Sequence, residues 1–576
     1  MNITRMRRTR LLAVLLLGIM AVFVVRLFYL QVIQHSYYTA LADQEQIRHW
    51  TLPAKRGEIY ALDGTLPVKL AMNEVAYTAW VNPSGITEPG RIISVMERVA
   101  GGNVVDSFRQ LLDKTDSRYQ VIAKRLSHTQ AQMIKRENIA GLGFTRADQR
   151  VYPEGQLASQ VLGFVNGEQQ GQYGIEAYFD DELRGRDGLL RTVADVRNVP
   201  LTIGNDNINQ PAQHGKNIVL TIDRNIQYQA ERFLSEGMKD LGVRYGSMIV
   251  IDPRTGAVKA MANMPTYDPS HYGDVDDLGV FNNNIISRPY EPASVIKTLT
   301  MSTGIDKGVM SPSSTYVNTD AVRVDDITIV NASKGQTGKI DMQRVLTWSL
   351  NTGTVTMAKW LGGGSINRGA RDTMYQYFHD RFRLGQRSGI ELANEAPGIV
   401  IPPTDPEGNA ARYANMTFGQ GMDVTPLQVA TAFSAVVNGG VYRKPTIVAG
   451  EVDADGKFIA AESNASQQII KQSTSSTMRV MTQRARQEFY AKQDLKGYTI
   501  GGKTGTAQTI EDGKYVFSTT EGTYIGYGAE KGKLPAYVIL VTFASPGKNI
   551  GGEMANPTFT KMSNWLIDYL KLQSKG

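Results

Sequence analysis

The first hydrophobic run of the chain is long enough to cross a bilayer. Residues 1–10 carry four arginines and no acidic residue, and residues 11–33 are then apolar except for Arg26 and a few small or polar positions. A helix needs roughly 20 residues to span the hydrocarbon core, and an arginine near one end of it can reach the headgroups. We therefore expect a transmembrane helix at 11–33, with residues 1–10 cytoplasmic and everything after residue 33 outside.

A cleaved signal peptide is the alternative to a retained anchor, because both combine a basic start with an apolar stretch. Small residues that suit cleavage occur at 40–42, which is well past the apolar run. Where cleavage would be expected, the chain instead has Leu27, Phe28 and Tyr29. The pattern favours a protein retained in the inner or plasma membrane by a single span.

Periodicity beyond the anchor predicts helices and strands in a body with two parts. Residues 34–210 are mixed and turn-rich, with helical patterns near 91–114 and 128–137, and a Gln- and Asn-rich piece at 203–217 marks a boundary. Beyond it we expect strands at 217–222, 498–500, 523–528 and 536–544, helices at 224–241 and 558–570, and a hairpin of 247–252 with 257–262. This order indicates an α+β domain over 211–576, in which one mixed sheet is sandwiched by helices.

The composition of the chain argues against several kinds of partner and site. The chain is 42% hydrophobic and 20% charged, with a net charge of +7 to which the first ten residues contribute heavily, so we expect no nucleic-acid partner. It has no cysteine, which excludes disulfides, thiolate metal sites and a cysteine nucleophile. Its six histidines are scattered, and we expect neither a metal nor a cofactor.

The first candidate for chemistry is Ser294-Val-Ile-Lys297, which follows a proline and opens a buried helical pattern. Positions i and i+3 share one face of a helix, so the Lys297 amine can approach the Ser294 hydroxyl. A serine becomes a nucleophile when a neighbouring base takes its proton, and a lysine can be that base if burial or a second cation lowers its pKa. The tetrapeptide alone is a weak signal, because it also occurs by chance at ordinary helix starts.

Two further patterns follow in order. Ser349-Leu-Asn351 offers a second hydroxyl to relay protons and an amide to hold a peptide group. On its own, this pattern is also typical of polar residues at the end of a helix. Lys503-Thr-Gly-Thr506 lies behind Gly501-Gly502, and small residues on an edge strand let a substrate backbone pair alongside. The lysine amine and the threonine hydroxyls there could bind a carboxylate.

The third pattern also matches a phosphate-binding loop. Residues 497–504 satisfy G-x-x-x-x-G-K-T in full, and the strand ending at Asp252 resembles a partner strand for magnesium. Such a loop needs a buried strand before it and a helix after it, whereas 491–496 is polar and Gly505 and Thr506 follow directly. Because everything after residue 33 is expected outside the membrane, the site would also have no access to cytoplasmic nucleotide. We therefore expect no nucleotide binding.

At these three motifs the sequence resembles the class B penicillin-binding proteins, monofunctional peptidoglycan D,D-transpeptidases. Leu350 gives the S-x-N form of the second motif, unlike class A β-lactamases. The resemblance covers nearly all of the chain after residue 50, through Arg56-Gly-Glu-Ile59, Gly174-Ile-Glu176, Val250-Ile-Asp-Pro-Arg-Thr-Gly256, Phe418-Gly-Gln-Gly421, Thr425-Pro-Leu-Gln428 and Asn438-Gly-Gly440. It departs at Ala293, where a glycine is usual, and at Tyr60-Ala-Leu62.

The resemblance implies a fold and a mechanism. It implies a pedestal of the dimerisation type at 34–210 and a transpeptidase domain with a mostly antiparallel central sheet at 211–576. Ser294 would form an acyl-enzyme with the penultimate D-Ala of a stem peptide, or with a β-lactam antibiotic. Lys297 would be the acylation base, kept neutral with the help of Lys503.

The other site residues would handle the substrate. Ser349 would pass a proton to the leaving group and Asn351 would hold the donor peptide. Thr504 and Thr506 would bind the terminal carboxylate beside Gly505, and the amides of Ser294 and Thr506 would form the oxyanion hole.

Within the family, the plan of the chain resembles the division-specific (septal) transpeptidase, with the elongation-specific enzyme as the alternative. Either would work beside a polytopic glycan polymerase of the SEDS type, and the septal enzyme with other divisome proteins. A β-lactamase would need a deacylating water that no feature identifies, and a β-lactam sensor would normally carry several spans. A catalytically silent scaffold for the division machinery is the remaining alternative.

Overall fold

The computed structural model describes residues 3–38, 47–193, 208–453, 455–462, 465–511 and 514–574. These residues form two compact units, one made of 1–56 with 184–215 and the other of 57–183 with 216–576. The small-residue pattern at 40–42 lies outside the described residues, as do 203–207 of the expected boundary piece. The limits 34–210 and 211–576 stay predictions.

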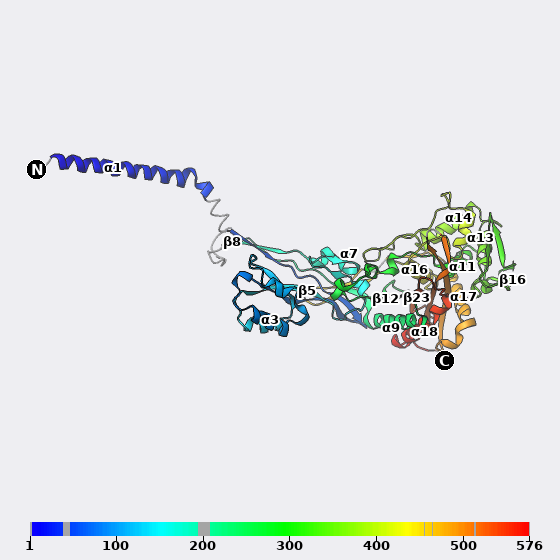
Figure 1. Ribbon diagram of the computed structural model, residues 1–576. Coiled ribbons are helices and arrows are strands. Elements are labelled where there is room, and N and C mark those ends of the chain that lie inside the picture. The colour runs from blue at the N-terminus through cyan, green and yellow to red at the C-terminus, as the bar shows by residue number, and fades with distance from the viewer. Residues whose placement is uncertain are drawn as a thin grey trace. The chain divides into compact units, whose positions relative to one another are not determined.

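The first unit contains the apolar helix and a small antiparallel sheet. Helix α1 (Ile3–Phe28) continues into the helical piece η1 (Tyr29–Ile33), and Thr9–Ile33 has a mean hydropathy of 2.8 with none of it buried (Figure 1). This helix fits the predicted single-pass anchor in length and composition. The sheet has the order β1-β8-β9, with bounds β1 (Ile47–Leu52), β8 (Gly188–Val193) and β9 (Ile208–Gln210).

In the second unit, a seven-stranded sheet combines four strands from residues 59–151 with three from later in the chain. Its strands are β2 (Ile59–Asp63), β3 (Leu66–Val81), β4 (Gln120–Leu126), β5 (Leu142–Val151), β10 (Asn217–Asp223), β18 (Val448–Val452) and β19 (Phe458–Ala460). Helices α3 (Pro89–Val99), α4 (Phe108–Leu111) and α5 (His128–Arg136) pack beside β3 and β4 around buried Ile92, Met96 and Ile134. The predicted helical patterns near 91–114 and 128–137 are confirmed.

The central sheet of the second unit has five strands in the order β12-β11-β23-β22-β21. Their bounds are β11 (Tyr245–Ile251), β12 (Val258–Met264), β21 (Tyr498–Glu511), β22 (Lys514–Glu530) and β23 (Tyr537–Ala544). Every neighbouring pair is antiparallel. Helices α9 (Arg224–Leu241) and α18 (Gly552–Tyr569) pack against it, and α16 (Pro426–Val437) and α17 (Gln472–Tyr490) also contact its strands (Figure 1). The predicted α+β sandwich is therefore confirmed.

The structure also contains shorter helices and strands. The helices are α6 (Ser159–Leu162), α7 (Gly174–Tyr178), α8 (Asp180–Arg184), α10 (Asn284–Ser287), α11 (Lys297–Asp306), α12 (Met342–Thr347), α13 (Asn351–Leu361), α14 (Arg368–Tyr375) and α15 (Ala410–Met416). The strands are β6 (Phe164–Val165), β7 (Gly171–Gln172), β13 (Thr315–Asn318), β14 (Ala321–Val324), β15 (Ile327–Val330), β16 (Gly338–Asp341), β17 (Val441–Arg443) and β20 (Ser466–Gln468).

The predicted start of the last helix, residue 558, is wrong. Helix α18 begins at Gly552 and includes Pro557. A proline inside a helix usually breaks it, because it removes a hydrogen bond. Here Ala555 and Asn556 are almost completely buried, so tertiary packing holds the first turns in place despite the proline.

Candidate active site

The turn that carries Ser294 is held by a second loop. Ser294 lies in a short helical turn (Ala293–Ile296) that runs into α11, whose Lys297 and Leu299 are buried. Ala293 has a left-handed φ of 51°, and its N–H donates to the carbonyl of Gly419 at 3.0 Å. A Cβ at position 419 would collide with the Ala293 backbone. The Phe418-Gly-Gln-Gly421 motif therefore supports the serine turn.

Lys297 is the centre of the polar cluster. Its Nζ lies 3.0 Å from Ser294 Oγ, as the i, i+3 spacing predicts. The same nitrogen lies 3.1 Å from Ser349 Oγ, 2.6 Å from the Ser349 carbonyl and 2.7 Å from Asn351 Oδ1. Hydroxyl, carbonyl and amide oxygens thus surround an amine that has no exposed surface.

The second motif forms a strained corner between helices α12 and α13. Ser349 has a left-handed φ of 58°, and Leu350 points into the core with no exposed surface. Asn351 opens α13, and its Nδ2 donates to the Val330 carbonyl at 2.9 Å. The corner therefore turns both polar side chains toward Lys297 and fixes the orientation of the Asn351 amide.

The third motif lies on β21, which is the end strand of the central sheet. Lys503 Nζ lies 3.0 Å from Ser349 Oγ and 3.2 Å from Thr504 Oγ1. Thr506 Oγ1 accepts a hydrogen bond from the Gly552 amide at 3.0 Å, which leaves its O–H free to donate.

Gly505 has a packing role in this strand. A Cβ there would lie 3.0 Å from the Pro292 carbonyl and 3.1 Å from Val295 Cγ1. Glycine therefore lets β21 approach the turn that carries Ser294, so that the first and third motifs face each other.

Burial sets the protonation of the two lysines. It lowers the pKa of Lys297 well below its usual value, and the nearby charge of Lys503 lowers it further. Burial also lowers the pKa of Lys503, to about 7. Both shifts favour the neutral amine, which is the state that a general base needs.

Comparison with known proteins agrees with this geometry. Residues 246–564 match the family described as penicillin binding protein transpeptidase domain, and residues 51–220 match the penicillin-binding protein dimerisation domain. The chain belongs to the class B penicillin-binding proteins.

Relatives of this penicillin-binding protein cover nearly all of it. It is 29% identical to stage V sporulation protein D of Bacillus subtilis, over 96% of this chain and 84% of that protein. It is 26% identical to peptidoglycan D,D-transpeptidase FtsI of Escherichia coli, over 95% of this chain and 89% of that protein. The structure of penicillin-binding protein 3 from Mycobacterium tuberculosis, complexed with aztreonam, aligns with a TM-score of 0.67 at 25% identity, over 92% of this chain and 98% of that one.

The phosphate-loop alternative for residues 497–504 is wrong for this penicillin-binding protein. Lys503 and Thr504 lie inside β21, which continues to Glu511, so no helix follows the lysine. Asp252 pairs with Arg254 at 2.7 Å within the turn after β11. Among the residues that the structure describes, no group of three or more histidine or acidic side chains could hold a metal ion.

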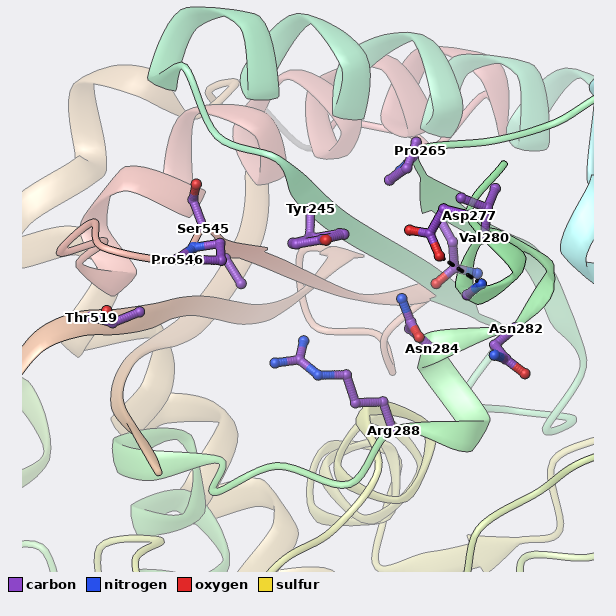
Figure 2. Close-up of a pocket in the computed structure, with 13 residues that line it drawn as sticks. Tyr245, Pro265, Asp277, Val280, Asn282, Asn284, Arg288, Thr519, Ser545 and Pro546 are labelled. Atoms are coloured by element: carbon purple, nitrogen blue, oxygen red, sulfur yellow. Dashed lines mark hydrogen bonds between the residues drawn. The ribbon is translucent and has the colours of Figure 1, made fainter. Parts of the chain in front are cut away.

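Two cavities within the described part of the transpeptidase domain bear on the site. One, of about 450 Å³, lies at an end of the central sheet and contains none of the motif residues (Figure 2). The other, of about 260 Å³, adjoins the lysine cluster, and its walls include Trp348, Ser349, Phe489, Lys503 and Glu553. Phe489 and Glu553 belong to no motif, so nothing local in the sequence marks them.

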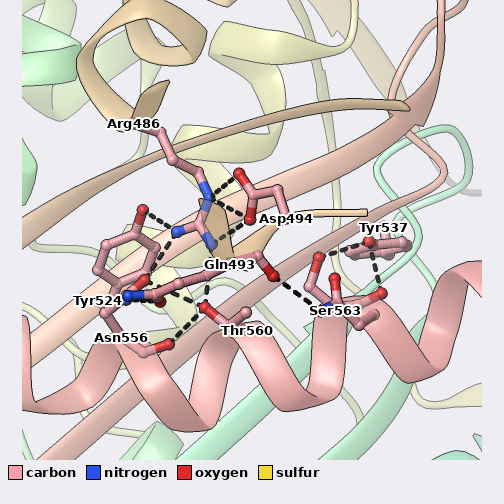
Figure 3. Close-up of polar contacts among 9 residues, drawn as sticks. Arg486, Gln493, Asp494, Tyr524, Tyr537, Asn556, Thr560 and Ser563 are labelled. Atoms are coloured by element: carbon pink, nitrogen blue, oxygen red, sulfur yellow. Dashed lines mark hydrogen bonds and ion pairs between the residues drawn. The ribbon is translucent and has the colours of Figure 1, made fainter. Parts of the chain in front are cut away.

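A buried arginine supports the smaller cavity from beneath, and sequence reasoning missed it as well. Arg486 on α17 pairs with Asp494 at 2.6 Å and donates to Asn556 at 2.7 Å and to Thr560 at 3.0 Å. It also donates to the hydroxyl of Tyr524 on β22 (Figure 3). The guanidinium thereby ties α17, β22 and α18 together directly behind β21.

Proposed function

We propose that this penicillin-binding protein cross-links peptidoglycan stem peptides through a serine acyl-enzyme, with Ser294 as the nucleophile and Lys297 as its base. The observation that carries the proposal is the 3.0 Å distance between Ser294 Oγ and the buried amine of Lys297. A buried amine of lowered pKa is a competent base at neutral pH, and an activated serine is a nucleophile for carbonyl carbon. Relatives named as D,D-transpeptidases support the same reaction class.

The acylation step transfers one proton and breaks one amide bond. Lys297 takes the proton of Ser294 Oγ, which attacks the carbonyl carbon of the penultimate D-Ala. The bond from that carbon to the nitrogen of the terminal D-Ala breaks, and the proton passes through Ser349 to the leaving amine. The amides of Ser294 and Thr506 stabilise the oxyanion.

In the second step an amine of a neighbouring stem peptide attacks the ester carbon. It gives a proton to the same base, the bond from that carbon to Ser294 Oγ breaks, and the base returns the proton to Oγ, which restores Ser294 and releases the cross-linked peptide. Asn351 holds the donor peptide in both steps. Lys503, Thr504 and Thr506 bind the terminal carboxylate of the donor, with Gly505 giving it room beside the strand. β-Lactams enter the same site and acylate Ser294.

The cellular role that fits the family plan is synthesis of the division septum. The FtsI relative supports it, and the elongation-specific role is the alternative. The apolar helix would anchor the protein with residues 1–10 in the cytoplasm, a pedestal over 34–210 and the transpeptidase domain over 211–576 outside. A SEDS-type glycan polymerase and divisome proteins would be its membrane partners. Depletion of the protein should give filaments for a septal role and round cells for an elongation role.

Labelling with a fluorescent penicillin tests the chemistry. We expect a stable adduct on the wild type and none on Ser294→Ala or Lys297→Ala. Ser287→Ala, a serine outside the lysine cluster, serves as the matched control and should label normally. Labelling that persists in Ser294→Ala would disprove the nucleophile, and rapid loss of the adduct by turnover would favour a β-lactamase. Growth supported by Ser294→Ala would favour a silent scaffold.

A further inference from the structure

The larger cavity lies at the same end of the central sheet as Thr506. Across four strands, Thr506 is the register partner of Gly522, Gly522 of Phe543, and Phe543 of Gly246. Tyr245, which precedes Gly246, lines the cavity. Neighbouring strands lie about 4.8 Å apart, so about 14 Å separates the cavity from the Thr506 end of the active site.

The walls of this cavity carry several polar side chains. Within the part of the chain that the structure describes, no hydrogen bond involves the side-chain amides of Asn282 and Asn284 or the hydroxyl of Tyr245. Tyr245 is 37% exposed, and Figure 2 shows Asn284 and Arg288 directed into the same opening. Asn263, by contrast, is fixed by bonds to Ser247 and Asn283.

The charges of the walls disfavour an anion. Among the described residues, Arg288 is the only basic one that lines the cavity, and it already pairs with the buried Glu521 at 3.2 Å. Asp277 adds a carboxylate to the same walls. A phosphate or nucleotide would therefore meet the carboxylate of Asp277 and an arginine that already pairs with Glu521. Free amides, an aromatic face and one half-exposed guanidinium suit a neutral ligand with many hydroxyl and acetamido groups.

We propose that this cavity binds an N-acetylated saccharide unit of the glycan strand whose stem peptide reacts at Ser294. The pyranose ring stacks on Tyr245, and its hydroxyl and acetamido groups bond to Asn282, Asn284 and the remaining N–H groups of Arg288. The volume of about 450 Å³ lies within the range of small-ligand sites. The identity of the ligand rests on the proposed transpeptidase function.

The distance supports this placement. An extended peptide of four residues spans about 14 Å, which is close to the separation between the cavity and Thr506. A glycan held at Tyr245 could therefore extend its stem peptide along the end of the sheet to the reacting serine. The chain from Arg288 to Ser294 also joins the two sites, because only five residues lie between them.

Binding of tri-N-acetylchitotriose to the full-length protein in detergent, followed by calorimetry, tests the proposal. We expect the trisaccharide to bind the wild type, and Tyr245→Ala and Asn284→Ala each to weaken it by about tenfold or more. Tyr228→Ala is the matched control, since Tyr228 is an exposed tyrosine on α9 that does not line the cavity. It should bind like the wild type.

Penicillin labelling of every variant separates this proposal from the proposed function. All variants should label normally, which also shows that they are folded. Normal labelling without saccharide binding by the wild type would overturn the saccharide site alone, whereas absent labelling of the wild type would overturn the transpeptidase. Unchanged binding by Tyr245→Ala, or displacement of the trisaccharide by a sugar-free stem peptide, would also overturn the saccharide site.

Discussion

Lys297 and Lys503 are joined by the hydroxyl of Ser349, which lies 3.1 Å from one amine and 3.0 Å from the other. Two buried amines this close cannot both carry a charge without strong repulsion. They therefore titrate as a coupled pair, and the charge of Lys503 acts directly on the basicity of Lys297. The serine between them gives a proton a short path from one amine to the other.

This coupling predicts the pH dependence of acylation. Lys297 acts as a base only when neutral, so the acylation rate rises as pH increases through its lowered pKa. Lys503→Met removes the neighbouring charge, which raises the pKa of Lys297 and moves the acid limb of the profile to higher pH. Stopped-flow acylation with a chromogenic β-lactam measures the shift. Lys496→Met, a surface lysine before β21, should leave the limb in place, and an acid limb that moves to lower pH in Lys503→Met would contradict the coupling.

The same substitution should stabilise the protein. The pKa of Lys503 is about 7 in the folded state and about 10.4 in an unfolded chain, so the buried charge costs most below pH 7. Above that pH the unfolded state binds more protons, and the stability of the wild type rises toward that of the variant. We expect Lys503→Met to gain about 1–2 kcal/mol of unfolding free energy at acidic pH, and less at alkaline pH. Urea unfolding at several pH values checks both the sign and the trend.

Local sequence patterns account for only part of the active site. The i, i+3 spacing alone predicts that Lys297 approaches Ser294, because both lie on one helical turn. The contacts of Ser349 with Lys297 and with Lys503 join segments that lie far apart in the sequence, and only the family resemblance predicted them. Phe489 and Glu553 carry no pattern at all, since their role comes from the packing of α17 and α18 beside β21.

The same distinction applies to the fold: local sequence patterns predict some of its elements, and contacts between distant segments determine others. The amphipathic pattern of α9 and the hairpin of β11 and β12 are local, and both were predicted correctly. The strand predicted at 498–500 in fact continues to Glu511. Glycines 501, 502 and 505 have low strand propensity, but β22 on one side and the Ser294 turn on the other hold them extended.

Ala293 offers a test of strain at the serine turn. Its φ of 51° is costly for a residue with a Cβ and costs nothing for glycine. We expect Ala293→Gly to raise the unfolding free energy by about 0.5–1 kcal/mol while penicillin labelling is retained. Ala485→Gly, inside α17, is the matched control and should lower stability by about 1 kcal/mol. A loss of stability in Ala293→Gly would show that the turn is not strained.

A buried ion pair links Arg150 to the Gly174-Ile-Glu176 motif, and Arg150 also bonds to the Arg56-Gly-Glu-Ile59 motif. Its removal should lower the stability of the protein. Arg150 Nε lies 2.7 Å from Glu176, with side-chain exposures of 3% and 0%, and Arg150 also donates to the Gly57 carbonyl at 2.7 Å and to Asn73 at 3.1 Å. Arg150→Met removes one buried partner of the Glu176 carboxylate together with the bonds to Gly57 and Asn73, so we expect a loss of about 3–5 kcal/mol of unfolding free energy.

The control for Arg150 is an ion pair of the same type on the surface. Arg368 and Asp372 on α14 are both about half exposed, so Arg368→Met should cost no more than about 0.5 kcal/mol. Replacing both buried partners, in Arg150→Met with Glu176→Leu, should recover part of the loss because the carboxylate that lost its Arg150 partner is then removed as well. If the double variant were less stable than Arg150→Met alone, loss of the Arg150–Glu176 pair would not be the cause, and the lost hydrogen bonds to Gly57 and Asn73 would be what holds these segments together.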